Sequence, residues 1–377
     1  MPIKIGTSGI AAAYVGADPI SRIYVGADMV FGTPEVTLAS LLFDDSQIGG
    51  LYQPWLEDSF YQNTSLTTLA DTPGQIVEGI RDYSGNNWHL TGAGALGHTV
   101  PRGHINLLLA TDTLATQDVT VTAAQHTLSF IGTGTVTLTG VSTDGPLVGT
   151  GAEDRVSLTF TPTAGTLTLT VSGTVELAQL NLGASFATPY QRVGATALDV
   201  SEAGSPTIRY VRTDGTSATG FIHTLGAALA LPFTVAGDFD IVDPARLSMF
   251  GVGSASSNLI YAHITRNRAA TADIEHRNGA QRGGAARFST TTAPRAVVSC
   301  VFASATGRTV YARGGSVSDS TEVASDNFAR VNLGSRFDSY SAVDFFGGYI
   351  RSGALDVSVV EEAATLLHDQ VEMGVSF

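Results

Sequence analysis

The chain has 377 residues, more than one typical domain, so we expect two or three domains. It is 43% hydrophobic and 14% charged with 42 glycines, which excludes a disordered chain and suits many short strands joined by small-residue turns. The net charge of −14 disfavours nucleic acid as the main partner, and the single cysteine, Cys300, excludes an intrachain disulfide framework and a cysteine-based metal site.

A short unit occurs twice within residues 1–33, as Tyr14-Val15-Gly16-Ala17-Asp18 and as Tyr24-Val25-Gly26-Ala27-Asp28. Each copy predicts a short strand that runs into a Gly-Ala-Asp turn, and two strands this short cannot build a core. We therefore expect residues 1–33 to pair with another chain or a neighbouring copy, as an attachment module. The residues expected to carry the attachment are Tyr14, Val15, Gly16, Tyr24, Val25 and Gly26.

Residues 34–100 show no sustained periodicity and contain both tryptophans, Trp55 and Trp88. A Pro/Gly-rich stretch at 71–74 and a polar turn at 84–87 interrupt them. We expect an irregular connecting segment here.

Residues 101–195 alternate apolar residues with threonine. Val119 and Val121, for example, alternate with Thr120 and Thr122, and glycines separate such runs. A period of two indicates antiparallel strands with one buried and one solvated face. Short strands at regular spacing predict a β-sandwich of the jelly-roll type.

Residues 196–377 form a second β-rich unit, with predicted strands at 207–211, 233–235, 247–252, 259–265, 297–302, 309–312 and 345–350. Near the end, Ser358 and Glu361 have the spacing of a capping box, and apolar residues at helical spacing follow it until Gly374. The predicted fold class is mainly β: two antiparallel β-sandwiches of the jelly-roll type after a short N-terminal β-hairpin repeat module, with one short C-terminal helix.

The start of the chain lacks the apolar region of a signal peptide, and no stretch approaches the roughly 18 apolar residues that span a bilayer. We expect synthesis in a cytoplasm, without a cleaved secretory signal and without membrane insertion.

The order of several segments along the chain carries a family resemblance. The first is the N-terminal repeat, which continues to Phe31. It is followed by four short segments at residues 50–55, 60–63, 72–75 and 82–86. The runs 178–183 and 188–192 are similar to the closing strand of carbohydrate-binding-like sandwiches, and 346–350 with the helix at 358–373 resembles the end of a laminin-G or concanavalin-like domain. Together they resemble fibre, spike and minor structural proteins of tailed phages and gene transfer agents.

Catalysis requires convergent titratable groups. Concanavalin-like glycosidases carry a Glu-x-Asp-x-x-Glu strand, because two carboxylates flank the scissile bond, and this sequence has no match. In the nearest acidic run, 238–243, alternation places Asp238 and Asp240 on a solvent face; a Ca²⁺ site is the alternative. The histidines lack zinc spacing, and no phosphate loop or dinucleotide fingerprint is present. We expect no enzyme activity, no metal and no cofactor.

Six arginines between Tyr261 and Arg295 form a basic island, opposed only by Asp273 and Glu275. Arginine pairs bidentately with carboxylates and sulfates. Arg266, Arg268 and Arg277 are therefore candidates to hold an acidic polysaccharide. An ordinary solvated face, or an interface with an acidic neighbouring subunit, is the alternative.

Aromatic rings stack on sugar rings, so a set of aromatic residues are further glycan-binding candidates, with core packing as the alternative for each. They are Trp55, Trp88, Tyr52, Tyr61, Tyr261 and Tyr340.

The resemblance implies a virion structural fibre or spike protein on the head or tail surface, assembled in the bacterial cytoplasm. It would attach to other virion proteins by its N-terminus and bind a host cell-surface polysaccharide, with avidity from many copies. A homo-oligomer is expected, and a trimer is favoured by likeness to fibres. The alternatives are a capsid or tail decoration (cement) protein without a receptor, and a polysaccharide depolymerase.

Overall fold

The computed structural model describes residues 13–15, 18–20, 23–25, 28–31, 36–43, 47–183, 187–213, 215, 220–241, 248–253, 261–266, 273–278, 287–289, 295–304, 307–312, 315–319, 328–336, 339–340 and 342–373. In the strands before residue 32 and between residues 261 and 289 it describes the backbone alone. Across these ranges no helix has the length and apolar character needed to cross a bilayer. The fold is mainly β with antiparallel sheets and a helix near the C-terminal end, which confirms the predicted fold class.

The two N-terminal repeats each form a hairpin. β1 (Ala13–Val15) pairs with β2 (Asp18–Ile20), and β3 (Ile23–Val25) pairs with β4 (Asp28–Phe31). In each hairpin the valine of the repeat lies opposite its aspartate. Gly16 and Gly26, two of the predicted attachment residues, lie outside the described residues.

The smaller sandwich packs a three-stranded sheet, β13-β10-β15, against a four-stranded sheet, β12-β11-β14-β9. Its strands are β9 (Gln117–Val121), β10 (His126–Gly132), β11 (Thr135–Gly140), β12 (Leu147–Val148), β13 (Gly151–Phe160), β14 (Gly165–Ser172) and β15 (Glu176–Leu182). Leucines, valines and Phe130 from both sheets fill its core, because the alternating apolar positions all face inward. This strand order is that of an eight-stranded jelly roll without its first strand. The segment before β9 takes that place, since Asn106 and Thr113 form bridges to β15.

The larger sandwich is built from a sheet of 16 strands that folds into two layers. Its strands are β5 (Gly49–Tyr52), β6 (Phe60–Tyr61), β7 (Ile76–Ile80), β8 (Leu90–Thr99), β18 (Ile208–Arg212), β19 (Phe221–Leu229), β20 (Phe233–Ile241), β21 (Ser248–Gly253), β22 (Tyr261–Arg266), β23 (Asp273–Asn278), β24 (Arg287–Ser289), β25 (Arg295–Ser304), β26 (Gly307–Ala312), β27 (Gly315–Asp319), β28 (Phe328–Leu333) and β31 (Val343–Ser352). One layer contains β5, β31, β20, β25, β26 and β27, and the other runs from β24 to β6. β18 pairs with both β8 and β31 and so joins the layers. Phenylalanines meet between them, with Phe233 and Phe328 5.2 Å apart and Phe250 and Phe345 5.4 Å apart at their ring centroids.

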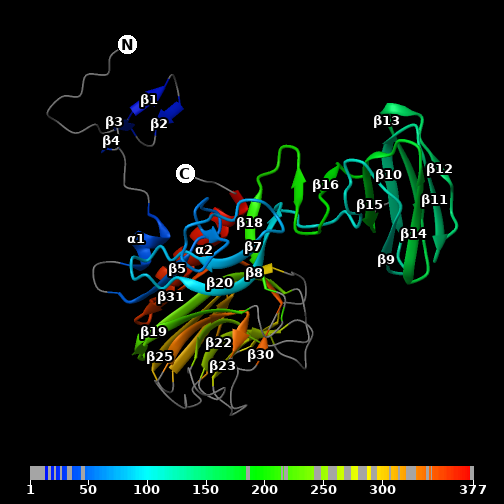
Figure 1. The fold of residues 1–377 in the computed structure, drawn as a ribbon. Coiled ribbons are helices and arrows are strands. Elements are labelled where there is room, and N and C mark those ends of the chain that lie inside the picture. The colour runs from blue at the N-terminus through cyan, green and yellow to red at the C-terminus, as the bar shows by residue number, and fades with distance from the viewer. Residues whose placement is uncertain are drawn as a thin grey trace.

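Residues 34–100 are not an irregular connecting segment, contrary to the prediction. β5 pairs with β31, and β8 pairs with β7, β18 and β19, so this segment supplies four strands of the larger sandwich. The sequence of this segment shows no period of two, because β5 is buried on both faces and so has no polar alternation. The strand with which β5 pairs, β31, also lies far along the chain. The jelly roll is therefore an insertion between β8 and β18, and Figure 1 shows it standing to one side of the larger sandwich.

Two helices cover the outer face of the β31-β20-β25 layer (Figure 1). They are α1 (Leu38–Leu42), which was not predicted, and α2 (Val357–Met373). Their buried residues Leu42, Val360 and Leu367 pack with Tyr349 and Phe346 in a second apolar cluster. α2 begins at Val357, so Ser358 lies inside its first turn and the predicted capping box is wrong.

This helical cover also explains a second error. Asp238 is 1% exposed, although alternation along β20 placed it on a solvent face. The alternation itself is correct, because Phe239 faces the core between the layers. The opposite face is buried as well, under α2.

Two short ribbons complete the chain. β16 (Gln191–Val193) pairs with β17 (Val200–Glu202) at the junction between the sandwiches, where Val100, Val193 and Val200 form a small apolar cluster. β29 (Ser335–Arg336) pairs with β30 (Ser339–Tyr340).

Candidate functional site on the jelly roll

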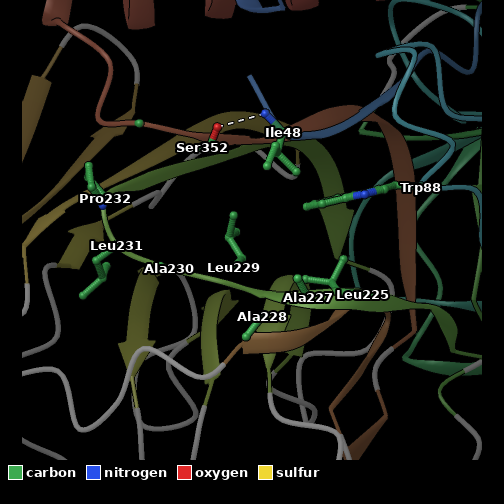
Figure 2. A pocket seen from close by; sticks show the side chains of 12 residues that line it. Ile48, Trp88, Leu225, Ala227, Ala228, Leu229, Ala230, Leu231, Pro232 and Ser352 are labelled. Carbon is green, nitrogen blue, oxygen red and sulfur yellow. Dashed lines mark hydrogen bonds between the residues drawn. The ribbon is translucent and has the colours of Figure 1, made fainter. Parts of the chain in front are cut away.

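Of the tryptophans predicted to stack on sugars, Trp55 is excluded by burial. It is 6% exposed and belongs to the apolar cluster beneath α2, so neither ring face is open. Tyr52 and Tyr61, at 0% and 3% exposed, are core residues too. Trp88 is 9% exposed but forms one wall of an apolar cavity of about 460 Å³ (Figure 2).

Two of the glycan-binding candidates in the basic island, Arg266 and Arg277, lie on β22 and β23, and the strand register separates them. Arg277 is directly opposite His263, whereas Arg266 is opposite Ile274. Arg266 and Arg277 thus occupy positions of opposite parity, which belong to opposite faces of a sheet. The register therefore divides the group that the sequence interpretation assigned to one site. Tyr261 shares the parity of Arg277, and Arg268 lies outside the described residues.

Polar side chains of the described structure converge instead around Tyr190, at the end of the jelly roll nearest the junction. The Tyr190 hydroxyl donates to Asp112 Oδ1 at 3.1 Å and lies 2.7 Å from Thr111 Oγ1. Arg192 Nε donates to Asp112 Oδ2 at 2.7 Å, and Arg192 Nη1 donates to Asp199 Oδ2 at 2.9 Å. The Asp112 side chain is 55% exposed and that of Arg192 is 38% exposed, so this cluster meets solvent.

The local fold fixes these side chains through Gln191, which lies between Tyr190 and Arg192. Its backbone N–H donates to Gln179 Oε1 at 2.7 Å, and its own Oε1 accepts from Ile105 N at 2.8 Å. Its Nε2 donates to Gly103 O at 2.8 Å. Because alternate strand residues share a face, holding Gln191 inward turns Tyr190 and Arg192 to the same outer side.

Beside Tyr190, hydroxyl and amide side chains occupy the face of β13-β10-β15 that points away from the jelly-roll core, and Thr127, Ser129 and Gln179 are buried there. Cross-strand rows bring together Thr159, Thr127 and Asn181, then Ser157, Ser129 and Gln179. The Arg155 guanidinium crosses these strands, donating to Ser129 Oγ at 3.0 Å and to Leu177 O at 2.8 Å. Its Cζ lies 5.6 Å from the centre of the Tyr190 ring, a cation–π contact.

The charges of this cluster balance, and its tyrosine and arginine keep their protons at neutral pH. Burial raises the pKa of Tyr190 to about 12, so its hydroxyl keeps its proton at neutral pH. Hydrogen bonds to Asp199 and Asp112 raise the pKa of Arg192. Two arginines, Arg155 and Arg192, balance Asp112 and Asp199. We refer to Tyr190, Arg155, Arg192, Asp112, Asp199 and Thr111 as the Tyr190 cluster.

The arrangement suits binding better than acid–base chemistry. Three of the described carboxylates are paired with arginines: Asp58 with Arg81, and Asp112 and Asp199 with Arg192. Within the described ranges, no group of three or more histidine, cysteine, aspartate or glutamate residues has the geometry of a metal site.

The sequence marked 188–192 as a closing strand but did not single out Tyr190 or Arg192 as site residues. Their i, i+2 spacing at the start of β16 was the available signal. Asp112 was not identifiable, because it lies 78 residues before Tyr190 in the chain.

No family model and no curated protein matches this chain. Solved structures give partial matches. The botulinum neurotoxin serotype D binding domain aligns with 11% identity and a TM-score of 0.33, over 43% of this chain and 42% of that one. Trypanosoma rangeli sialidase aligns with 12% identity and a TM-score of 0.34, over 43% of this chain and 28% of that one. An arabinofuranosidase complexed with arabinofuranosyl-α-1,2-xylobiose aligns with 12% identity and a TM-score of 0.39, over 79% of this chain and 51% of that one. The chain thus spans less than half the length of the first two, and at these TM-scores the likenesses carry no functional argument.

Proposed function

We propose that this protein is a structural fibre or spike component of a phage-like particle that binds a host surface glycan through the jelly roll. The observation that carries the binding part is the Tyr190 cluster. An aromatic ring, two arginines and a carboxylate are held in place by neighbours and still reach solvent. Sugars are bound by such combinations, because a ring covers the apolar face of a pyranose while planar polar groups pair with its hydroxyls.

The charge balance of the Tyr190 cluster favours a neutral glycan. Its two arginines are matched by Asp112 and Asp199, so an anionic sugar gains no net attraction. This differs from the acidic polysaccharide expected for the basic island.

The first prediction concerns Tyr190→Ala. We expect about a tenfold loss of affinity for the neutral oligosaccharide that the full chain binds best in a panel of neutral and acidic oligosaccharides, because the stacking ring is removed. Tyr190→Phe keeps the ring and loses only the bonds to Thr111 and Asp112, so a loss of about twofold is expected. Titration calorimetry measures both, with thermal unfolding as the folding control.

Several results would contradict this proposal. A folded chain that binds no oligosaccharide points to a decoration or cement protein, and release of reducing sugar points to a depolymerase. Equal affinities for wild type and Tyr190→Ala would place any glycan elsewhere.

The attachment part rests on the N-terminal hairpins and on the resemblance of their repeats to those of phage fibres. β1-β2 and β3-β4 are each two-stranded sheets, below the size that is stable alone in water. Further strands from another chain would complete them by edge pairing. The expected partners are other virion proteins and further copies of this chain.

The second prediction is that removing residues 1–33 lowers the assembly state. Sedimentation at matched concentrations should give oligomers, with trimers favoured, for the full chain and monomers for the truncated one. A full-length variant with Val15→Pro and Val25→Pro should resemble the truncation, because proline removes a ladder donor from each hairpin. Identical masses for all three proteins would rule out assembly through these strands.

A further inference from the structure

The cavity beside Trp88 has a chemistry unlike that of the Tyr190 cluster. It lies where β19 leaves its ladder with β28: Thr224 pairs with Arg330, and pairing resumes only at Leu229 with Phe328. The chain from 225 to 232 lines one side of the hollow without a break. Figure 2 shows Ile48 and Leu229 pointing toward one another across it, with the Trp88 ring beside them.

The walls of this cavity are fixed. Trp88 N donates to Asp82 Oδ2 at 2.8 Å, and Trp88 O accepts from the Tyr52 hydroxyl at 2.8 Å. The Trp88 ring stacks on His223 at 6.0 Å with an interplanar angle of 19°. On the other side Ile48 N donates to Ser352 Oγ at 2.9 Å, and Ser352 N donates to Ile48 O at 2.7 Å. The hollow therefore exists before any ligand arrives, as ligand sites commonly do.

The lining excludes polar ligands. Among the described residues around it, the side chains are aliphatic or aromatic except for Ser352, and none is charged. The Ser352 oxygen already accepts a hydrogen bond from Ile48. The side chains here offer a sugar almost no hydrogen-bond partners and offer a charged group no counter-charge, so both would lose bonds to water on entering. Covering these apolar side chains with hydrocarbon removes apolar surface from water, which is favourable.

Size and shape narrow the class of ligand further. A volume of about 460 Å³ lies within the range of small-molecule sites. Residues 225–232 line the cavity as one continuous segment, and the residues at 226, 227, 228 and 230 are alanine or glycine. Because these side chains are small, the cavity extends along the segment, and we call it the trough. Ile48 at its rim is 53% exposed, which leaves apolar surface at the mouth uncovered.

We propose that this trough binds one aliphatic chain of an amphiphile, with the polar head remaining outside in water. The trough supplies apolar walls on both sides of the chain and no partner for the head. This site is separate from the Tyr190 cluster, and its existence does not depend on glycan binding.

The two tryptophans make a direct test feasible. Trp55→Phe leaves Trp88 as the sole tryptophan, and Trp88→Phe leaves only Trp55, which is buried in the other apolar cluster. In the full-length Trp55→Phe protein, 11-bromoundecanoic acid below its aggregation concentration should quench Trp88 fluorescence saturably. Undecanoic acid, without the bromine, should compete and not quench. The Trp88→Phe protein should show no saturable quenching.

Two blocking variants complete the test in the Trp55→Phe background. Ala227→Phe fills the trough and Ala227→Asp places a charge in it, and this alanine is exposed, so the core is untouched. Each should weaken binding by at least about tenfold. If one variant loses its native circular dichroism, the other decides.

The source of the chain is distinguished by a parallel titration with phosphatidylcholine vesicles that carry brominated acyl chains. Quenching by vesicles and by the fatty acid identifies membrane lipid, and quenching by the fatty acid alone identifies a free amphiphile. The proposal is overturned by absent or unsaturable quenching, by quenching that survives the blocking variants, or by competition from maltotriose. Tyr190→Ala should leave the quenching unchanged, which separates this site from the proposed glycan site.

Discussion

Replacing Asp82 by alanine should destabilise the larger sandwich by about 4 kcal/mol, because a buried carboxylate that organises its first strands is lost. Asp82 is 7% exposed. Its Oδ1 accepts from Leu51 N and Ser84 N, and its Oδ2 accepts from Trp88 N and Ser84 Oγ, each at 2.8 Å. Alanine would leave the backbone N–H groups of Leu51 and Trp88 without a partner in the interior, at roughly 1–3 kcal/mol each before relaxation, and that of Ser84 without one at a half-buried position.

Urea unfolding followed by tryptophan fluorescence measures this effect selectively. Both tryptophans belong to the larger sandwich, so the signal does not include the jelly roll. Asp82→Asn keeps one acceptor oxygen and should lose about half as much. Asp71→Ala, at an exposed position in the same segment, should stay within about 0.5 kcal/mol of wild type. An unchanged midpoint for Asp82→Ala would mean that the segment does not stabilise the sandwich.

Asp82 also shows why part of the fold escaped prediction. Its sequence neighbourhood, with Ser84, Gly85 and Asn86, has the composition of a turn, and a turn does form there. What the composition cannot show is that the carboxylate reaches back to β5 and forward to Trp88. By contrast, alternation with threonine predicted the jelly-roll strands well, because those sheets have one buried and one polar face.

The same reasoning applies to the candidate site. Period-two alternation is a local property, so it places residues on a face but does not say what covers that face. For this reason alternation puts Asp238 on a solvent face although it is buried, and the sequence predicts a sugar platform at Trp55, which α2 and its neighbours bury. The Tyr190 cluster depends on Asp112 and Arg155, which come from different parts of the chain and meet only after the jelly roll closes. Alternation within one segment carries no signal for such a meeting.

Arg212→Ala should also destabilise the larger sandwich strongly, because Arg212 lies at the seam where β18 and β31 join its two layers. Arg212 Nε donates to Asp344 Oδ1 at 2.6 Å, and Arg212 Nη2 donates to Asp344 Oδ2 at 2.5 Å. The Asp344 side chain is 6% exposed, and the pair lies where β18 meets β31. Removing the arginine leaves a buried carboxylate without its counter-charge, so we expect a loss of about 3–5 kcal/mol at neutral pH.

This loss should depend on pH in a defined direction. Burial raises the pKa of Asp344 above its usual value, and Arg212 opposes that rise. A carboxyl group whose folded pKa lies above its unfolded pKa binds more protons in the native state, so its contribution to stability falls as pH rises through the folded pKa. Without Arg212 the pKa rises further, because nothing then offsets burial.

The deficit of Arg212→Ala, measured by urea unfolding, should therefore be smaller at about pH 5 than at about pH 8. The double variant Arg212→Ala with Asp344→Asn tests the cause. It removes the buried charge, so it should recover part of the loss at about pH 8 and flatten the difference between the two pH values. A deficit that is equal at both pH values, and unchanged by Asp344→Asn, would show that Arg212 stabilises the seam by packing over the Tyr210 ring, 5.7 Å away, rather than through its charge.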